Sequence, residues 1–475
     1  MAYSSSVSIK GFDGLNQTGD GFNMTMRYAT DMENVDVTGG GFRTVMKSLP
    51  LAQSLDNPIG TLARLHRRYH AVDSEKDVLV AMSGGRVWTK LLHGDDAWQA
   101  RYGGLTDNNC DYVTYEVNRE GSDAPIDVLL FTNAKDGMFC LYGDNLTVEP
   151  VTTPYKFGVL ARFNERIWGS GIDGDPDKLV YSAPFDPFDW SLNVEIPEDG
   201  AGEVLQPSWD GDSFLALRPF GSQLLAFKRS SIWRVMGTNP GEFAMKEQYG
   251  HGAIIENTVA VSSSYALMLG WGGINRYDGT VNEPFRQEAV GRILQERLNT
   301  DARGSAVAVM HDDVYYLAIP IDGSTTNNAI LTYSMTDGVF SLITGVSVAS
   351  FLTVDDTLLY TSAVAPGVVF TFGKGTEAMP LRWVCGYQDL GGKNVDKSSF
   401  IVRFMAEADA PFELMITMQS EKKTKTRTVS VTPSKPCKVR LSTKGKYFRL
   451  KVESTGTTPY KILGGFQIDL DTDAD

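Results

Sequence analysis

The sequence feature that most constrains the fold is an apolar hairpin that recurs along residues 61–375. Each copy starts with a turn residue, continues with an aliphatic residue and usually an aromatic one, and leads out along a strand. The copies start at Gly85, Gly137, Arg166, Ser231, Gly273, Gly338 and Gly367, 29 to 65 residues apart. Four-stranded propeller blades run about 40–50 residues. The pattern therefore predicts an all-β chain with a β-propeller of six or seven irregular blades.

Two further segments flank this pattern, and one insertion interrupts it. Residues 1–60 hold many glycines and short alternating runs, and we expect these turn-rich strands to join the propeller. The spacing of apolar residues over Gln287–Leu298 predicts a short amphipathic helix, which either caps a blade edge or binds a partner. Residues 376–475 alternate apolar and polar residues between turns, which predicts a C-terminal β-sandwich.

The net charge of −14 is unevenly distributed along the chain. Residues 376–475 hold 16 Lys or Arg and 12 Asp or Glu residues, so residues 1–375 carry a net charge of −18. An acidic body repels phosphate backbones, which argues against tight wrapping of nucleic acid but lets DNA slide past. Because no long apolar run and no secretory leader is present, we expect synthesis in a cytoplasm and no membrane insertion.

No motif in the sequence carries catalysis or cofactor binding. There is no nucleophile elbow, no HExxH pair, no phosphate loop and no GxGxxG before a helix. We therefore expect no enzyme, no catalytic, metal or cofactor-binding residues, and no cofactor. Many glycosidases are propellers, but any pair chosen among 58 acidic residues would be arbitrary. A carbohydrate-binding or glycan-hydrolysing propeller, acting as a receptor-binding module, is the alternative function.

Two segments have weak metal-binding patterns that also have structural explanations. Asp173, Asp175 and Asp177 imitate the first half of a calcium loop, but Lys178 and Pro184 stand where that loop needs Gly and Glu. An irregular calcium site near Asp173–Asp177 is left open beside a turn in which Asp side chains bond the backbone. The histidines at positions 66 and 70 form a close pair without a Cys or carboxylate nearby in sequence, which favours exposed basic surface.

Residues 184–190, Pro-Phe-Asp-Pro-Phe-Asp-Trp, are predicted to form a rigid corner. Two prolines restrict the backbone, and the aromatic residues can pack beneath it. The residues assigned to this structural corner are Asp177, Tyr181, Pro184, Asp186, Pro187 and Trp190. Farther along, the segment Ser420–Ser430 is rich in lysine and predicts an exposed hairpin. Its cations are solvated or form a protein interface with an acidic surface of another subunit: Lys422, Lys423, Lys425 and Arg427.

Four segments, in order, resemble the tail hub or packaged-DNA stabilisation proteins of short-tailed phages, and more distantly their tail nozzle proteins. They are ENVDVTGGGFRTVMKSLPL (Glu33–Leu51), DPDKLVYSAPFDPFDWS (Asp175–Ser191), GDSFLALRPFGSQLLAFKRSSIWRVMGTNPGEF (Gly211–Phe243) and GWGGINRYDGT (Gly270–Thr280). The similarity covers most of residues 30–375 and is weak beyond them. None of these segments contains a catalytic motif, and the resemblance rests on their order.

The resemblance implies a structural virion protein of the phage tail, assembled in the cytoplasm of the host bacterium. Such a protein would form a ring of six copies below the portal and its adaptor, and bind a needle, plug, tail fibre or spike below. The ring would continue the DNA channel and help retain packaged DNA until ejection, without sequence-specific binding. An acidic wall suits that role, because like charge keeps DNA from sticking during ejection.

Overall fold

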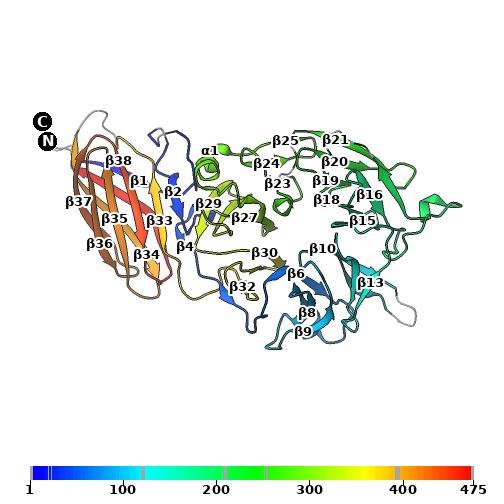
Figure 1. The fold of residues 1–475 in the computed structure, drawn as a ribbon. Coiled ribbons are helices and arrows are strands. Elements are labelled where there is room, and N and C mark those ends of the chain that lie inside the picture. Colours follow the sequence, from blue (N-terminus) through cyan, green and yellow to red (C-terminus); the bar gives the residue numbers. More distant parts are fainter. Residues whose placement is uncertain are drawn as a thin grey trace.

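The computed structural model describes residues 4–19, 21–22, 24–118, 124–205, 207, 211–250, 252, 255–390 and 396–471. Within these ranges the chain is all-β and forms a β-propeller with a two-sheet sandwich at its side (Figure 1). Among the described residues, no helix is long and apolar enough to cross a membrane.

The described part of the propeller has seven four-stranded blades. Blade 1 comprises β6 (Ile59–His66), β7 (Asp77–Ser83), β8 (Arg86–Leu91) and β9 (Gln99–Gly103). Blade 2 comprises β10 (Asp111–Val117), β11 (Ile126–Asn133), β12 (Gly137–Tyr142) and β13 (Val148–Val151). Blade 3 comprises β14 (Val159–Phe163), β15 (Arg166–Ser170), β16 (Lys178–Tyr181) and β17 (Gly202–Leu205). Blade 4 comprises β18 (Ala216–Phe220), β19 (Gln223–Phe227), β20 (Ile232–Met236) and β21 (Ala244–Gly250).

The last three blades follow the same order. Blade 5 comprises β22 (Ala260–Val261), β23 (Ala266–Leu269), β24 (Ile274–Tyr277) and β25 (Val281–Pro284), and β25 also pairs in parallel with β21. Blade 6 comprises β26 (Val307–His311), β27 (Val314–Ile319), β28 (Ala329–Ser334) and β29 (Val339–Thr344). Blade 7 comprises β30 (Ser350–Val354), β31 (Thr357–Thr361), β32 (Val369–Thr371) and the N-terminal β5 (Leu49–Pro50).

The ring closes through strands that are distant in sequence. The first strand of each blade lies beside the first strand of the next, and β30 returns to β6. The strand β5 supplies the outermost strand of blade 7, where Pro50 faces Phe370. A proline is tolerated there because an edge strand does not need every N–H for a ladder. Separate buried apolar clusters fill the spaces between neighbouring blades, so that each blade packs on two others.

The recurring hairpin of the sequence occurs once in each of these seven blades. It begins the third strand in most blades, for example β8 after Gly85 and β24 after Gly273. In blade 3 it begins the second strand, β15, and in blade 6 the fourth, β29. This shift explains the irregular spacing of the copies.

The sandwich uses both ends of the chain. One sheet has the order β3-β4-β39-β34-β37, with β1 also paired to β39, and the other has the order β2-β33-β38-β35-β36. Its C-terminal strands are β33 (Leu381–Cys385), β34 (Lys397–Ala408), β35 (Phe412–Ser420), β36 (Thr424–Val431), β37 (Cys437–Gly445), β38 (Phe448–Ser454) and β39 (Tyr460–Asp471). Its N-terminal strands are β1 (Ser4–Ile9), β2 (Ala29–Glu33), β3 (Val35–Asp36) and β4 (Arg43–Thr44).

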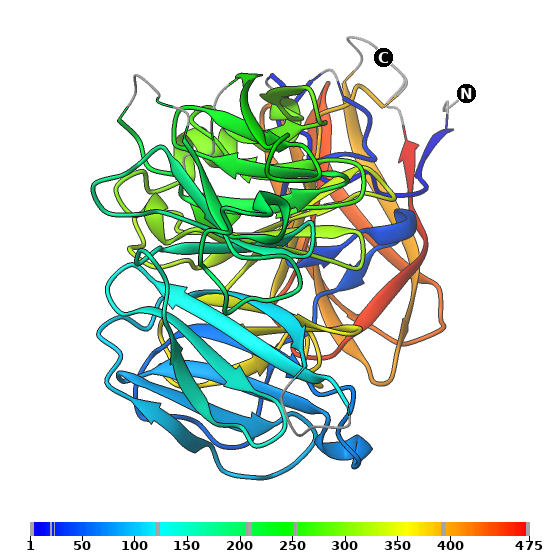
Figure 2. The ribbon, with the colours of Figure 1, turned by 90° about the vertical axis from the view of Figure 1, so that its right-hand side faces the viewer.

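The expectation that residues 1–60 join the propeller holds for β5 but is wrong for the strands before it. Four strands of this N-terminal segment belong to the sandwich, and the first strand pairs with the last one of the described chain (Figure 2). Short alternating runs indicate strands but not their partners, because pairing is decided by non-local burial. Phe12 and Phe42, for example, pack edge-to-face with Trp383 of β33 in the sandwich core.

The helical insertion packs inward. The helix α1 (Gln287–Arg292) continues as a π-helix over Ile293–Arg297. Its apolar residues Val290 and Ile293 are buried in the core cluster that joins blades 5 and 6 to the sandwich. The backbone N–H of Gln17 donates to Glu288 O at 2.7 Å, which ties the N-terminal segment to the helix. The apolar face is covered by the chain itself, so the helix caps a blade edge and does not present that face to a partner.

Candidate functional site

The predicted corner lies in the connection between β16 and β17, residues 182–201, which we call the rim loop because β17 is the outermost strand of blade 3. Trp190 packs on Phe157 with ring centroids 5.3 Å apart, and its indole N–H donates to Pro187 O at 3.0 Å. The ring centroids of Phe188 and Tyr142 of blade 2 lie 6.2 Å apart. The corner therefore covers the apolar core between blades 2 and 3.

The other corner residues have distinct places. Tyr181 is buried under Phe243 of blade 4, with ring centroids 5.1 Å apart. Pro184 is half-buried and Pro187 is buried, as expected for prolines that pin a corner. Asp186 is exposed, and its carboxylate accepts the N–H of Phe188 at 2.9 Å, an Asx turn that fixes the backbone locally.

A buried arginine anchors the rim loop. Arg166, on β15, donates to the backbone carbonyls of Ser182 at 2.7 Å and Gly200 at 2.6 Å, and also to that of Glu198. Its guanidinium lies 5.2 Å above the Tyr181 ring, and burial lowers its pKa from the ordinary value. Because the three carbonyls belong to both ends of the loop, one side chain fixes the whole connection.

The anchored loop exposes an unusual surface. Residues 191–199 are all exposed, and the relative exposures of Leu192, Val194 and Ile196 are 75%, 88% and 52%. Phe185 is also exposed, at 73%. The loop has no Lys or Arg, and among the described residues none of its acids forms an ion pair: Asp186, Asp189, Glu195, Glu198 and Asp199. Exposed apolar residues gathered among charges mark an interaction surface.

Asp177 has a structural role outside the loop. Its carboxylate contacts the ammonium of Lys228, on the far side of the interface between blades 3 and 4. Lys228 is fully buried and lies 4.9 Å over the Phe214 ring. Asp175 contacts Lys178 at 3.3 Å. Two of the three carboxylates of the calcium-like segment are thus engaged with lysines, which explains the Asp pattern without a metal.

The lysine cluster belongs to a larger basic surface. Lys422 and Lys423 occupy the turn before β36, while Lys425 and Arg427 lie on β36, the edge strand of its sheet. The segment is therefore a turn and an exposed edge strand. Nearby β37 adds three exposed cations, Lys438, Arg440 and Lys444. We call residues 421–446 the basic edge; they hold nine Lys or Arg residues and one acid, Glu421.

A cavity of about 1340 Å³ occupies the centre of the propeller. It is lined by the first strands of the blades, with Tyr112, Phe214 and Phe351 among mainly aliphatic residues. Its charged lining is balanced: Asp111, Asp173, Glu256, Lys135, Arg162 and Arg218. Asp111 accepts the N–H of Leu160 at 3.0 Å, so this carboxylate serves the junction of blades 2 and 3.

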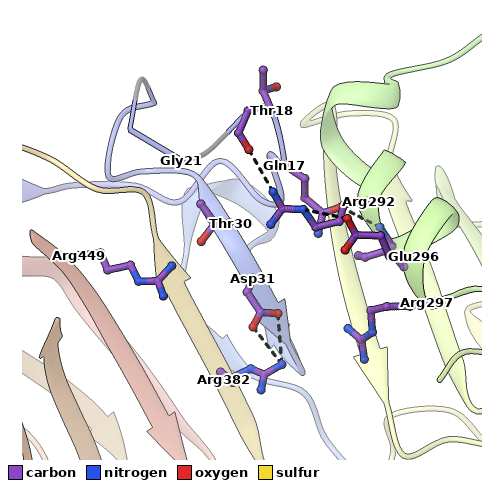
Figure 3. Close-up of a pocket in the computed structure, with 12 residues that line it drawn as sticks. Gln17, Thr18, Gly21, Thr30, Asp31, Arg292, Glu296, Arg297, Arg382 and Arg449 are labelled. Atoms are coloured by element: carbon purple, nitrogen blue, oxygen red, sulfur yellow. Dashed lines mark hydrogen bonds and ion pairs between the residues drawn. The ribbon is translucent and has the colours of Figure 1, made fainter. Parts of the chain in front are cut away.

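A smaller cleft of about 370 Å³ lies where the N-terminal segment, the helical insertion and the sandwich meet (Figure 3). Four arginines line it, and carboxylates contact three of them: Arg292, Arg297 and Arg382. Glu33 contacts Arg297 of the insertion at 3.3 Å and Arg382 of the sandwich at 2.9 Å. Asp322 contacts the same guanidinium nitrogen of Arg297 at 2.7 Å. The cleft is therefore a polar clamp between the two domains.

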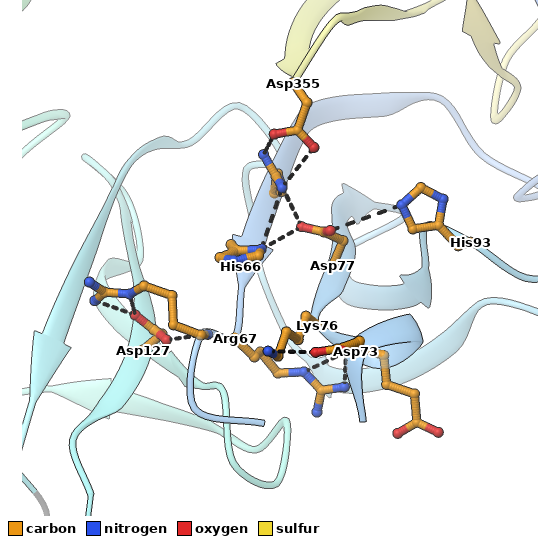
Figure 4. Close-up of polar contacts among 11 residues, drawn as sticks. His66, Arg67, Asp73, Lys76, Asp77, His93, Asp127 and Asp355 are labelled. Atoms are coloured by element: carbon orange, nitrogen blue, oxygen red, sulfur yellow. Dashed lines mark hydrogen bonds and ion pairs between the residues drawn. The ribbon is translucent and has the colours of Figure 1, made fainter. Parts of the chain in front are cut away.

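The histidine pair is divided between different contacts. His66 ends β6, and its Nδ1 lies 2.8 Å from Asp77 Oδ1 (Figure 4). Arg64 joins the same carboxylate to Asp355 of blade 7 at 2.9 Å. Burial acts to raise the pKa of Asp77, but the bonds from His66 and Arg64 outweigh it and lower that pKa. Among the described residues no group of three potential ligands could hold a metal ion. The network joins the first blade to the last.

The sequence identifies the lysine cluster of the basic edge, but it does not reveal other residues that make the two surfaces. The anchor Arg166 resembles any strand arginine until its distant carbonyl partners are known. The exposed run at Leu192, Val194 and Ile196 has the alternation of a strand, and only the absence of a covering element in the described chain distinguishes it. The cations of β37 lie near those of β36 because the two sheets pack together, and this proximity cannot be predicted from the spacing of the residues in sequence.

Comparisons with known proteins find only distant similarity to solved structures. No protein-family model and no curated protein matches the chain. The WD40 domain of Neurospora crassa Pan2 matches at TM-score 0.37 and 10% identity, over 66% of this chain and 89% of that one. BBS1N in complex with ARL6DN matches at TM-score 0.42 and 9% identity, over 69% and 96%. The computationally designed Ika8 protein matches at TM-score 0.39 and 10% identity, over 69% and 99%.

Proposed function

We propose that this chain is a structural protein of a bacteriophage tail, a ring-forming hub or nozzle below the portal and adaptor. It continues the DNA channel and helps retain packaged DNA until ejection. The observation that carries the proposal is the rim loop, a rigidly anchored loop that exposes apolar and acidic side chains at the end of a stiff propeller. A part that works by contact needs such a surface.

The segments that resemble tail hub proteins support the proposal because two of them lie together in the structure. The segments Asp175–Ser191 and Gly211–Phe243 meet across the interface of blades 3 and 4. Asp177 of the first segment contacts Lys228 of the second, and Tyr181 packs on Phe243. The similar residues are therefore one packed unit, and the first segment continues into the rim loop.

The charge distribution suits a wall along which DNA moves. Residues 1–375, which include the whole propeller and four strands of the sandwich, carry the acidic excess of the chain. Acids outnumber Lys and Arg there by 46 to 28, so phosphates are repelled, binding is weak and sliding is easy. The partners of this role are other copies of the chain, portal and adaptor proteins above, and a needle, plug, fibre or spike below.

The test is co-expression of the full chain with the portal and adaptor proteins encoded beside it. Negative-stain microscopy and mass measurement should find a ring of six copies attached below the adaptor. A monomer that never joins the portal–adaptor complex would overturn the proposal. A glycan array run on the same preparation checks the alternative, because saturable binding of one glycan class, weakened by substitutions in the central cavity, would favour a receptor-binding propeller.

A further inference from the structure

The two surfaces described above lie at opposite ends of the molecule. Figure 1 places β36 and β37, which carry the basic edge, at the left-hand end of the sandwich. It places β16, from which the rim loop starts, at the right-hand end of the propeller. The whole propeller separates them, so the two surfaces cannot meet within one copy of the chain.

Their charges are opposite and largely uncompensated. In the described chain the basic edge has two ion-pair contacts, from Lys422 and Lys444 to Asp396, at 3.5 and 3.6 Å. Lys423, Lys425 and Arg427 are exposed and form no ion pair with the described residues. The rim loop carries five carboxylates and no cation. Opposite potentials of this kind steer two surfaces together and fix their register.

The rim loop also has the properties of a preformed ligand. Arg166 holds both of its ends, and backbone bonds from Ala183 to Asp189 O (2.8 Å) and from Ala201 to Ser191 O (3.0 Å) close it. A loop that is already ordered loses little conformational freedom when it binds. Its exposed apolar side chains can pack on the aliphatic stems of the lysines and arginines of the basic edge.

We propose that the rim loop of one copy docks on the basic edge of the next copy, so that identical chains join head to tail. The proposal rests on the proposed ring and identifies the surfaces that hold it together. A head-to-tail contact uses two different patches, and such contacts close into a ring when the rotation between copies allows it. Until the ring closes, the open chain of copies has a free rim loop at one end and a free basic edge at the other.

The test uses charge reversal in the full-length protein. The edge variant carries Lys423→Glu, Lys425→Glu and Arg427→Glu. These side chains are exposed, so the variant should fold, which circular dichroism and thermal unfolding verify. Sedimentation velocity over a range of protein concentrations then measures self-association of the wild type and the variant.

The complementary loop variant carries Glu195→Lys, Glu198→Lys and Asp199→Lys, all of them exposed. In each variant alone the three reversed charges oppose like charges on the partner surface, and we expect the dissociation constant for self-association to rise by at least about 100-fold. An equimolar mixture of the two variants has opposite charges at every contact, so assembly should return with alternating copies. Wild-type assembly should also weaken as salt increases from about 0.05 to about 0.5 M.

The matched control reverses three exposed cations on neither surface, Lys10, Lys246 and Lys374, each to Glu. It has the same net charge as the edge variant and should assemble like the wild type. A monomeric wild type at every concentration overturns the inference, and so does a mixture that fails to assemble. If the wild type forms rings that both variants form equally well, the ring of the proposed function stands and the contact lies elsewhere.

Discussion

The substitution Arg166→Met tests whether the rim loop is held in place by one buried side chain. Methionine keeps much of the apolar length of arginine but removes the donors that reach the carbonyls of Ser182, Glu198 and Gly200. The relative exposure of Arg166 is only 3%, so water does not replace these donors while the loop stays closed.

The magnitudes decide how the loop responds. Each hydrogen bond from a charged donor contributes about 1.5–3 kcal/mol, so a loop that stayed closed would lose about 5–9 kcal/mol. Among the backbone bonds that remain, those from Ala183 to Asp189 O, from Ala201 to Ser191 O and from Phe185 to Glu165 O contribute about 1 kcal/mol each. Opening exposes the carbonyls to water at a smaller cost. We therefore expect local release of the loop and retention of the propeller.

Hydrogen exchange measured by mass spectrometry is the assay. Peptides that cover residues 196–201 should exchange at least about 100-fold faster in the variant, while peptides from β14 and β15 should not change. The matched control is Arg162→Met, because Arg162 also lies on blade 3 but its side chain is 45% exposed and pairs with Glu165. It should leave the loop unchanged. Unchanged exchange of residues 196–201 in the Arg166 variant would refute the reasoning.

Three further predictions address individual side-chain contacts. Asp177→Asn removes the carboxylate that faces the fully buried Lys228 and should destabilise the protein by about 3–5 kcal/mol. Urea unfolding checks this with the variants Asp177→Asn and Lys228→Met and with the double variant. The loss of stability in the double variant should be smaller than the sum of the losses in the two single variants. Trp190→Ala should lower the free energy of unfolding by about 3 kcal/mol, the low end of the range for a tryptophan, because the side chain is half-buried. The variant should also assemble less well. Normal folding and assembly would mean that the corner has no role. The hydrogen bond from Arg297 lowers the pKa of Asp322 in the folded protein below its ordinary 3.8. The stabilisation by this contact is therefore fully present above pH 3.8 and is lost as the pH falls through the folded pKa. The difference in stability between the wild type and Asp322→Asn, measured by thermal unfolding, should narrow below about pH 3.8.

The sequence predicts the blades well because their signal is local. Each hairpin needs a turn residue and a pair of apolar runs, and both can be recognised in consecutive residues such as Gly85 to Trp88. The blade number of seven became visible only with β5, a strand of two residues that completes blade 7 from the other end of the chain. A two-residue strand has no periodicity to detect.

The contacts that position the candidate surfaces are non-local, and therefore they could not be predicted. Asp177 was assigned to a structural corner for its neighbours in sequence, but its partner Lys228 is 51 residues away in the next blade. The prolines and Trp190 of the corner were recognisable because a proline restricts its own backbone wherever it stands. The lysine cluster was visible in sequence, whereas its extension onto β37 depends on the packing of two sheets.

The most direct test of the central claim is the arrangement of copies in the assembled particle, measured by electron cryo-microscopy of the co-expressed complex. We predict a closed ring of six identical chains in which residues 185–199 of each copy contact residues 422–446 of the next. A particle that contains one copy of the chain, or a ring in which both of these surfaces face solvent, would contradict the account.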